Sequence, residues 1–218
     1  MASTKKPTKA VDPAQRVVDL VYEALETELG GVEIYRAALK CADNGDLRNE
    51  WQKYLAQTER HVEVLRDLCK TLGLDPELDT PGRQAVRTIG KALVSTIHLA
   101  AGSVPRAAAQ IVAAECVTLA ETKDHLNWSL LAQVAEQAGA ANATAIGEAV
   151  DRVEDEEDEH VYHNAGWARE LWLDSLGVPA QLPPPEEQDG VESMAEAAEA
   201  KESRRPSQKG GKAVADDE

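Results

Sequence analysis

The chain has few cysteines, and their arrangement excludes several kinds of site. Cys41, Cys69 and Cys116 are odd in number, lie far apart and form no Cys-x-x-Cys pair. A four-cysteine iron site, a zinc ribbon and a disulfide framework are therefore not expected.

Long apolar runs and long basic runs are also missing. No stretch reaches the roughly 18 consecutive apolar residues of a membrane helix. The basic residues 1–9 have no apolar region behind them, as a secretory signal requires. The formal net charge is −16, which argues against a nucleic-acid surface. These absences predict a cytoplasmic protein that binds neither a membrane nor nucleic acid.

The 218 residues suffice for one sizeable domain with tails. Residues 1–12 are polar and predict a disordered N-terminal arm, and residues 13–179 contain the folded domain. Residues 180–218 begin with a proline run and continue with Glu, Ala, Lys, Ser and Gly. Such a composition buries too little apolar surface to fold, so we expect a disordered tail, with at most a transient helix around residues 194–201. No motif identifies a partner for this tail.

The fold class predicted for the domain is all-α, because Val and Ile recur at helical spacing and not in alternation. Turn and stop signals separate the expected helices, which cover about 13–42, 47–72, 83–101, 105–138 and 143–176. Short links join the first helix to the second and the fourth to the fifth, so each pair should form an antiparallel hairpin. The link of about thirty residues between these hairpins contains the helix at 83–101. This connectivity predicts a four-helix bundle with one long crossover that holds an extra helix.

The apolar faces of the four bundle helices are interrupted near their middles by acidic and imidazole side chains. A buried carboxylate is costly unless it is paired, protonated or bound to a cation. Several such groups at one level of a bundle predict a metal site, and carboxylates with one imidazole per ion favour iron or manganese. We expect one or two ions, held by Glu28, His61, Glu121, Glu157 and His160.

Two local motifs accompany these five positions: Tyr35 follows Glu28 by seven residues, and Glu157-x-x-His160 lies on the last helix. With them, residues 14–177 resemble the ferritin-like di-iron carboxylate superfamily, which contains bacterioferritin and rubrerythrin. Residues 57–65 also resemble the second helix of stress-associated bacterial ferritin-like proteins. The resemblance implies a ferritin-like four-helix bundle with metal ligands at the five positions. It also implies an oxidoreductase of ferroxidase or peroxidase type, in iron handling or oxidative-stress defence, and is compatible with a homo-oligomer.

One position departs from that pattern: the family has Glu three residues before His61, and this chain has Thr58. Glu59 cannot replace it, because it points about 200° away from His61 around the helix. Three explanations remain open: an asymmetric site, a ligand supplied by Asp124 or His125, or a single bound ion. Whether the protein is an enzyme stays open. A non-catalytic interaction or structural module with a degraded site is the main competing hypothesis, and a hydroxylase with an apolar channel to the metal is a further one.

Overall fold

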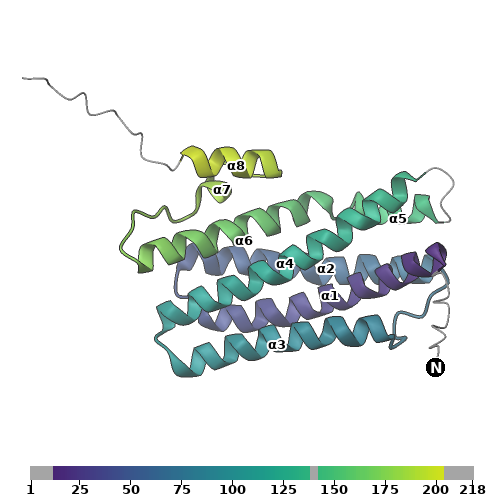
Figure 1. Cartoon of the computed structure of the whole chain (residues 1–218), viewed down its shortest axis with the longest axis horizontal. Helices are drawn as coiled ribbons and strands as arrows, with labels where there is room; N and C mark the ends of the chain where they lie inside the picture. The colour runs from purple at the N-terminus through teal and green to yellow at the C-terminus, as the bar shows by residue number, and fades with distance from the viewer. Residues whose placement is uncertain (1–11, 138–141, 204–218) are drawn as a thin grey trace, which may run out of the picture.

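The computed structural model describes residues 12–137 and 142–203, and all the regular secondary structure in them is helical (Figure 1). This confirms the all-α prediction as a helical bundle. None of the described helices combines the length and the apolar character that crossing a membrane requires. The helices are α1 (Pro13–Cys41), α2 (Gly45–Thr71), α3 (Pro81–Ser103), α4 (Arg106–Glu136), α5 (Ala143–Val150), α6 (Glu154–Ser175), α7 (Pro185–Gln188) and α8 (Met194–Ser203).

Side-chain caps fix where the first three helices begin. Asp12 accepts a hydrogen bond from the backbone of the first turn of α1, and Pro13 occupies the first helical position, as the sequence predicts. Asn44 caps α2 in the same way, so α2 begins at Gly45, two residues earlier than expected. Thr80 caps α3. The predicted helix end at residue 138 lies outside the described residues.

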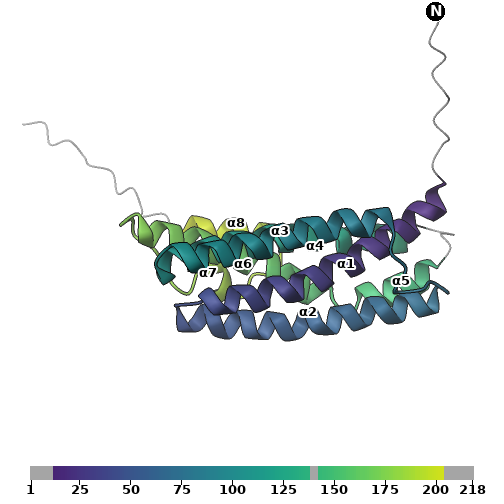
Figure 2. The ribbon, with the colours of Figure 1, turned by 90° about the horizontal axis from the view of Figure 1, so that it is seen from below.

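The long helices run alongside one another, and α1 is central to them (Figures 1 and 2). It packs against α2, α3 and α4, while α4 also packs against α6. The crossover helix α3 lies along α1 and α4. A Cβ atom added to Gly90 of α3 would lie 3.6 Å from the Cα atom of Gly30 in α1, so this glycine pair permits the close approach of the two helices.

The apolar core forms two clusters, one toward each end of the bundle. One contains Tyr35, Trp51 and Trp167, and the other contains Leu25 and Leu65. The acidic and imidazole residues of the predicted site lie between these clusters on α2, α4 and α6, and Glu28 of α1 lies near the inner edge of the second cluster. The bundle therefore has a buried polar layer across its middle.

The helix expected at 143–176 is broken, which corrects the sequence prediction. Helix α5 ends at Val150, and α6 begins at Glu154. The new start places Glu154, Asp155, Glu156 and Glu157 in the first turn of α6. Carboxylates are stabilised at a helix N-terminus by the helix dipole, and four in succession favour a start at this point over a continuous helix.

The segment 180–203 does not show the disorder expected of it. Helix α7 packs on α6, and Glu186 of α7 is fully buried, with Arg169 of α6 donating from Nη1 and Nη2 to its two carboxylate oxygens at 2.5 and 2.7 Å. A Cβ atom on Gly166 would lie 2.8 Å from Glu186 Oε2, so this glycine makes room for the carboxylate. The composition of the segment does not predict this contact with the bundle, because a single bidentate ion pair between Arg169 and Glu186 holds the segment in place. The rest of the expected tail, and residues 1–11 of the expected arm, lie outside the described residues.

Arg169→Ala is expected to release α7 and α8 from the bundle. The substitution leaves the buried Glu186 carboxylate without its cation, which typically costs about 3–5 kcal/mol. Amide hydrogen exchange should accelerate across residues 185–203 and stay slow in α1 and α4. Arg36→Ala, which removes an exposed pair with Glu33, is the control. Unchanged exchange in α7 would show that the ion pair does not hold the segment.

Candidate metal centre

Five side chains from four helices meet in the polar layer. Helix α1 supplies Glu28, α2 supplies His61, α4 supplies Glu121, and α6 supplies Glu157 and His160. None is more than 3% exposed. Each of these positions lies on the inward face of its helix, because the apolar residues on either side follow the same helical spacing.

The five residues form two triads that share Glu157. In the first triad, His61 Nδ1 lies 2.9 Å from Glu157 Oε1 and 3.4 Å from Glu28 Oε1. In the second, His160 Nδ1 lies 3.5 Å from Glu121 Oε2 and 3.6 Å from Glu157 Oε1. Atoms that bind one transition-metal ion at about 2.1 Å lie about 3 Å apart, so both triads have separations suited to a shared cation.

The orientation of both imidazoles turns one ring nitrogen toward the carboxylates. Nε2 of His61 lies 2.8 Å from Glu156 Oε2, and Nε2 of His160 lies 3.0 Å from Gln57 Oε1. Since both partners are acceptors, each Nε2 carries the proton and donates it. In neutral histidine the inward Nδ1 atoms then hold lone pairs that face carboxylate oxygens, the arrangement by which neighbouring groups orient metal-binding histidines.

Several polar atoms of the layer are buried without a hydrogen-bond partner. They include both Nδ1 atoms, both oxygens of Glu157 and one oxygen each of Glu28 and Glu121. No arginine or lysine in the described part of the chain forms an ion pair with these three glutamates. A buried carboxylate group without a cation is strongly disfavoured, so these atoms form a set of ligands that a bound cation would satisfy.

Asp124 brings a fourth carboxylate to the layer, whereas Thr58 and His125 contribute no ligand to it. Asp124 lies one turn after Glu121, is 4% exposed and has an unpartnered Oδ1. Thr58 is buried too, but its hydroxyl donates to the Tyr54 carbonyl oxygen of the preceding turn. His125 is only half-buried and pairs with Asp158. Between Asp124 and His125 as the source of the missing ligand, the geometry favours Asp124.

Two aromatic residues support the carboxylates reciprocally between α1 and α4. The Trp128 indole of α4 donates to Glu28 Oε1 of α1 at 2.8 Å. Tyr35 of α1 lies near Glu121 of α4, and burial together with the Glu121 charge holds the pKa of Tyr35 well above its usual value. Each aromatic residue follows a glutamate of its own helix by seven residues, and the sequence shows this spacing. It does not show that each aromatic residue contacts the glutamate of the other helix.

The concentration of charge shifts the pKa values of the layer. Burial, and then the charge of Glu28, raise the pKa of Glu157 to about 7, and the same two causes raise the pKa of Asp124 well above its usual range. Burial acts to lower the pKa of His61, but the nearby carboxylates of Glu28 and Glu157 outweigh it and raise the value to about 11. Without a metal, the layer is therefore expected to hold extra protons at neutral pH.

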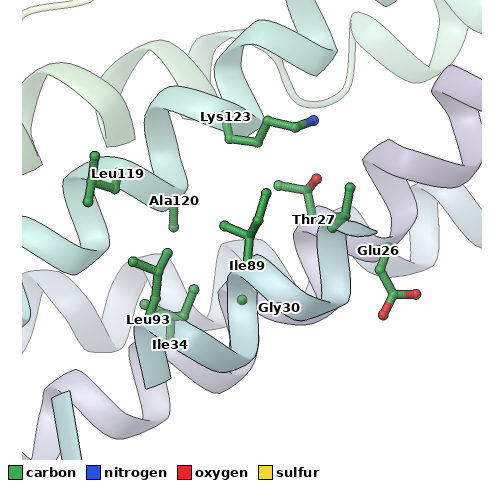
Figure 3. Close-up of a pocket in the computed structure, with 11 residues that line it drawn as sticks. Glu26, Thr27, Gly30, Ile34, Ile89, Leu93, Leu119, Ala120 and Lys123 are labelled. Atoms are coloured by element: carbon green, nitrogen blue, oxygen red, sulfur yellow. The ribbon is translucent and has the colours of Figure 1, made fainter. Parts of the chain in front are cut away.

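A cavity beside the break between α5 and α6 reaches the centre. Its lining includes Glu157 and Trp128, with the His125–Asp158 pair farther out. A second, mainly apolar cavity between α1, α3 and α4 is shown in Figure 3. It is lined by residues such as Ile89 and includes none of the five central residues, so it is not the apolar channel to the metal that a hydroxylase would need.

Sequence reasoning missed Gln57 and Glu156 as partners of the imidazoles. Each lies beside a residue that draws attention for other reasons, Gln57 next to Thr58 and Glu156 next to Glu157 in an acidic run. Their positions on the helices lie off the apolar faces, so the sequence predicts that both side chains are exposed to solvent. Only the packing of α2 against α6 shows that they reach the histidines. Glu115, which precedes Glu121 on α4, accepts a hydrogen bond from Trp172 Nε1 away from the layer.

The chain is thus an all-helical protein with buried acidic and histidine groups that could bind metal. Comparison with protein-family models, with curated proteins and with solved structures finds no significant match. The case for a metal centre therefore depends on the geometry of the polar layer.

Proposed function

We propose that this protein is a ferritin-like bundle that binds two iron or manganese ions in the polar layer and oxidises Fe(II) with oxygen or peroxide. The observation that carries the proposal is the convergence of the two triads on Glu157 without any lysine or arginine partner among the described residues. Two divalent cations would balance the carboxylates of Glu28, Glu121, Asp124 and Glu157 with both histidines neutral. This balance favours two ions over one.

Each residue has a defined role in this proposal. Glu157 would be a ligand common to both ions, with Glu28 and His61 as the other ligands of one and Glu121 and His160 as those of the other. Asp124 supplies from α4 the carboxylate that the family pattern places on α2, which makes the site asymmetric. Fe(II) is the substrate and would supply the electrons for reduction of oxygen or peroxide. The cavity at Glu157 offers the substrate a route from the surface.

A non-catalytic helical module remains the second candidate, and one observation favours it. The Thr58 side chain is committed to a backbone carbonyl, so α2 contributes a single imidazole to the layer. In that case protonated Asp124 and Glu157 would share protons with the histidines, and the layer would be stable without any ion. The two candidates differ in what they predict for metal uptake.

Anaerobic equilibrium dialysis of the untagged protein against Fe(II) or Mn(II) tests the proposal. We expect up to two ions per chain in the polar layer, and oxidation of the bound Fe(II) when oxygen or peroxide is added. Glu59→Gln, an exposed position two residues before His61, is the control and should bind the same number. No uptake of either metal by the folded protein would favour the non-catalytic module.

A further inference from the structure

A second group of acidic and imidazole side chains lies on the other side of Tyr54 from the central layer. It consists of Glu50 of α2 with Glu159 and His163 of α6. We propose that these three residues form a separate binding site for one divalent transition-metal ion. The proposal is independent of the central site, because it uses none of its ligands.

The distances in this outer cluster suit a single cation. His163 Nδ1 lies 3.3 Å from Glu50 Oε1 and 4.0 Å from Glu159 Oε1, and the three atoms lie within 4.8 Å of one another. The Tyr54 hydroxyl lies 2.9 Å from the same Nδ1, so an ion bound at this nitrogen would displace the contact with Tyr54. An imidazole with two carboxylates is a donor set that binds Zn(II), Co(II), Mn(II) or Fe(II).

The hydrogen bonds within the protein leave this cluster incompletely satisfied. His163 is 2% exposed, and Nε2, the ring nitrogen other than the one that lies near Glu50 and Glu159, has no hydrogen-bond partner. Glu187 of α7 adds a third carboxyl group nearby, and its buried Oε2 atom has no partner either. Burial, and then the charge of Glu50, raise the pKa of Glu187 to about 7. The docked C-terminal segment therefore brings another ionisable carboxyl group to a region already rich in them.

In the described part of the chain, Lys53 is the one cationic side chain in contact with the cluster. A metal ion would compete with its ammonium group for the Glu159 carboxylate. Its Nζ atom lies 2.8 Å from both oxygens of Glu159. The Lys53 side chain is 46% exposed, so it can swing into solvent and free Glu159 for a metal. Glu159 is 27% exposed, which leaves the outer cluster open to ions, whereas the five central residues are each at most 3% exposed.

Tyr54 connects the two regions. Its ring lies 4.1 Å from that of the central His160, centroid to centroid, while its hydroxyl contacts His163. An ion at the outer cluster would thus be one aromatic ring away from the second central triad. Tyr54 also keeps the two sets of ligands apart, which makes it possible to remove them separately.

Anaerobic titration with Co(II), measured by metal content and by visible absorption, tests the outer site. Glu50→Gln and His163→Asn should each weaken the binding of one ion per chain by at least about tenfold and leave the other ions in place. Glu157→Gln should do the reverse, removing central ions and keeping the outer one. Glu63→Gln, an exposed position on α2, is the control for nonspecific binding to surface carboxylates.

Lys53→Met provides a second, opposite test that does not remove a ligand. Removing the competing ammonium should tighten Co(II) binding at the outer cluster by about tenfold. If Glu50→Gln and Lys53→Met, both folded by circular dichroism, bind Co(II) as the unmodified protein does, the outer site does not exist. Failure of Glu157→Gln to change the binding would instead count against the proposed central site.

Discussion

Glu157→Gln is expected to abolish the stabilisation that Fe(II) or Mn(II) gives to the folded protein. A ligand at about one hundred times its dissociation constant adds roughly 2.7 kcal/mol to the free energy of unfolding. Glu157 is the residue common to both triads, so its loss affects both ions at once. Anaerobic thermal unfolding with and without metal, in a Glu50→Gln background that removes the proposed outer site, measures the effect: metal should shift the Tm when Glu157 is present and should not shift it after Glu157→Gln.

In the absence of metal, the same substitution should have the opposite effect on stability. Burial and the neighbouring charge of Glu28 disfavour ionised Glu157, which is why its pKa rises from an ordinary 4.5 to about 7. At pH 8, ionisation of the buried Glu157 lowers the free energy of unfolding by roughly 3 kcal/mol. A neutral glutamine at this position does not carry that cost. The metal-free variant should therefore unfold at a higher Tm than the metal-free parent. Glu59→Gln should change neither value. A variant that loses stability without metal, and still gains it with metal, would contradict both expectations.

The metal-free protein is also expected to become less stable as pH rises from about 5 to 8. Glu157 has a raised pKa, so the folded state holds its proton more tightly than the unfolded state, and this contribution is lost between about pH 4.5 and 7. His61 acts in the same direction: its stabilisation is complete below its unfolded pKa near 6.5 and declines as pH rises toward 11. Between about pH 5 and 8, the deprotonation of Glu157 and His61 should together lower the free energy of unfolding by at least about 3 kcal/mol.

Urea unfolding at a series of pH values, with and without Mn(II), tests this dependence. Glu26 and Glu50 have lowered pKa values, so the stability they provide is lost as pH falls below the ordinary range, which limits the acid side. Metal competes with protons for the layer, so the stabilisation by Mn(II) should increase from pH 5 to 8. A metal-free protein most stable at pH 8 would show that the layer does not store protons.

The five central positions were predictable from sequence because helical spacing fixes which side chains share a face. Glu28 and His61 interrupt otherwise apolar seams, and the structure places both beside Glu157. The choice between Asp124 and His125 was not predictable. These two residues differ by about 100° around α4, and only the packing against α6 turns one inward and leaves the other at the surface.

In the fold too, features set by neighbouring residues could be predicted from the sequence, and contacts between distant residues could not. Caps such as Asp12 and Asn44 are local signals, and the helix starts follow from them. The docking of residues 180–203 depends on the meeting of Glu186 with Arg169, seventeen positions apart, in a segment of low apolar content. A composition average cannot detect one such pair, and this explains why composition alone did not predict the contact of this segment with the bundle.

The division of the apolar core into two clusters has a consequence for how the centre could exchange ions. Each cluster is buried by contacts among its own residues, so the ends of the bundle keep their packing when the space between them changes. Small shifts of α2 or α6 at mid-length would then widen the layer while both ends stay closed. In this bundle, loading and release of a cation need not involve unfolding of any helix.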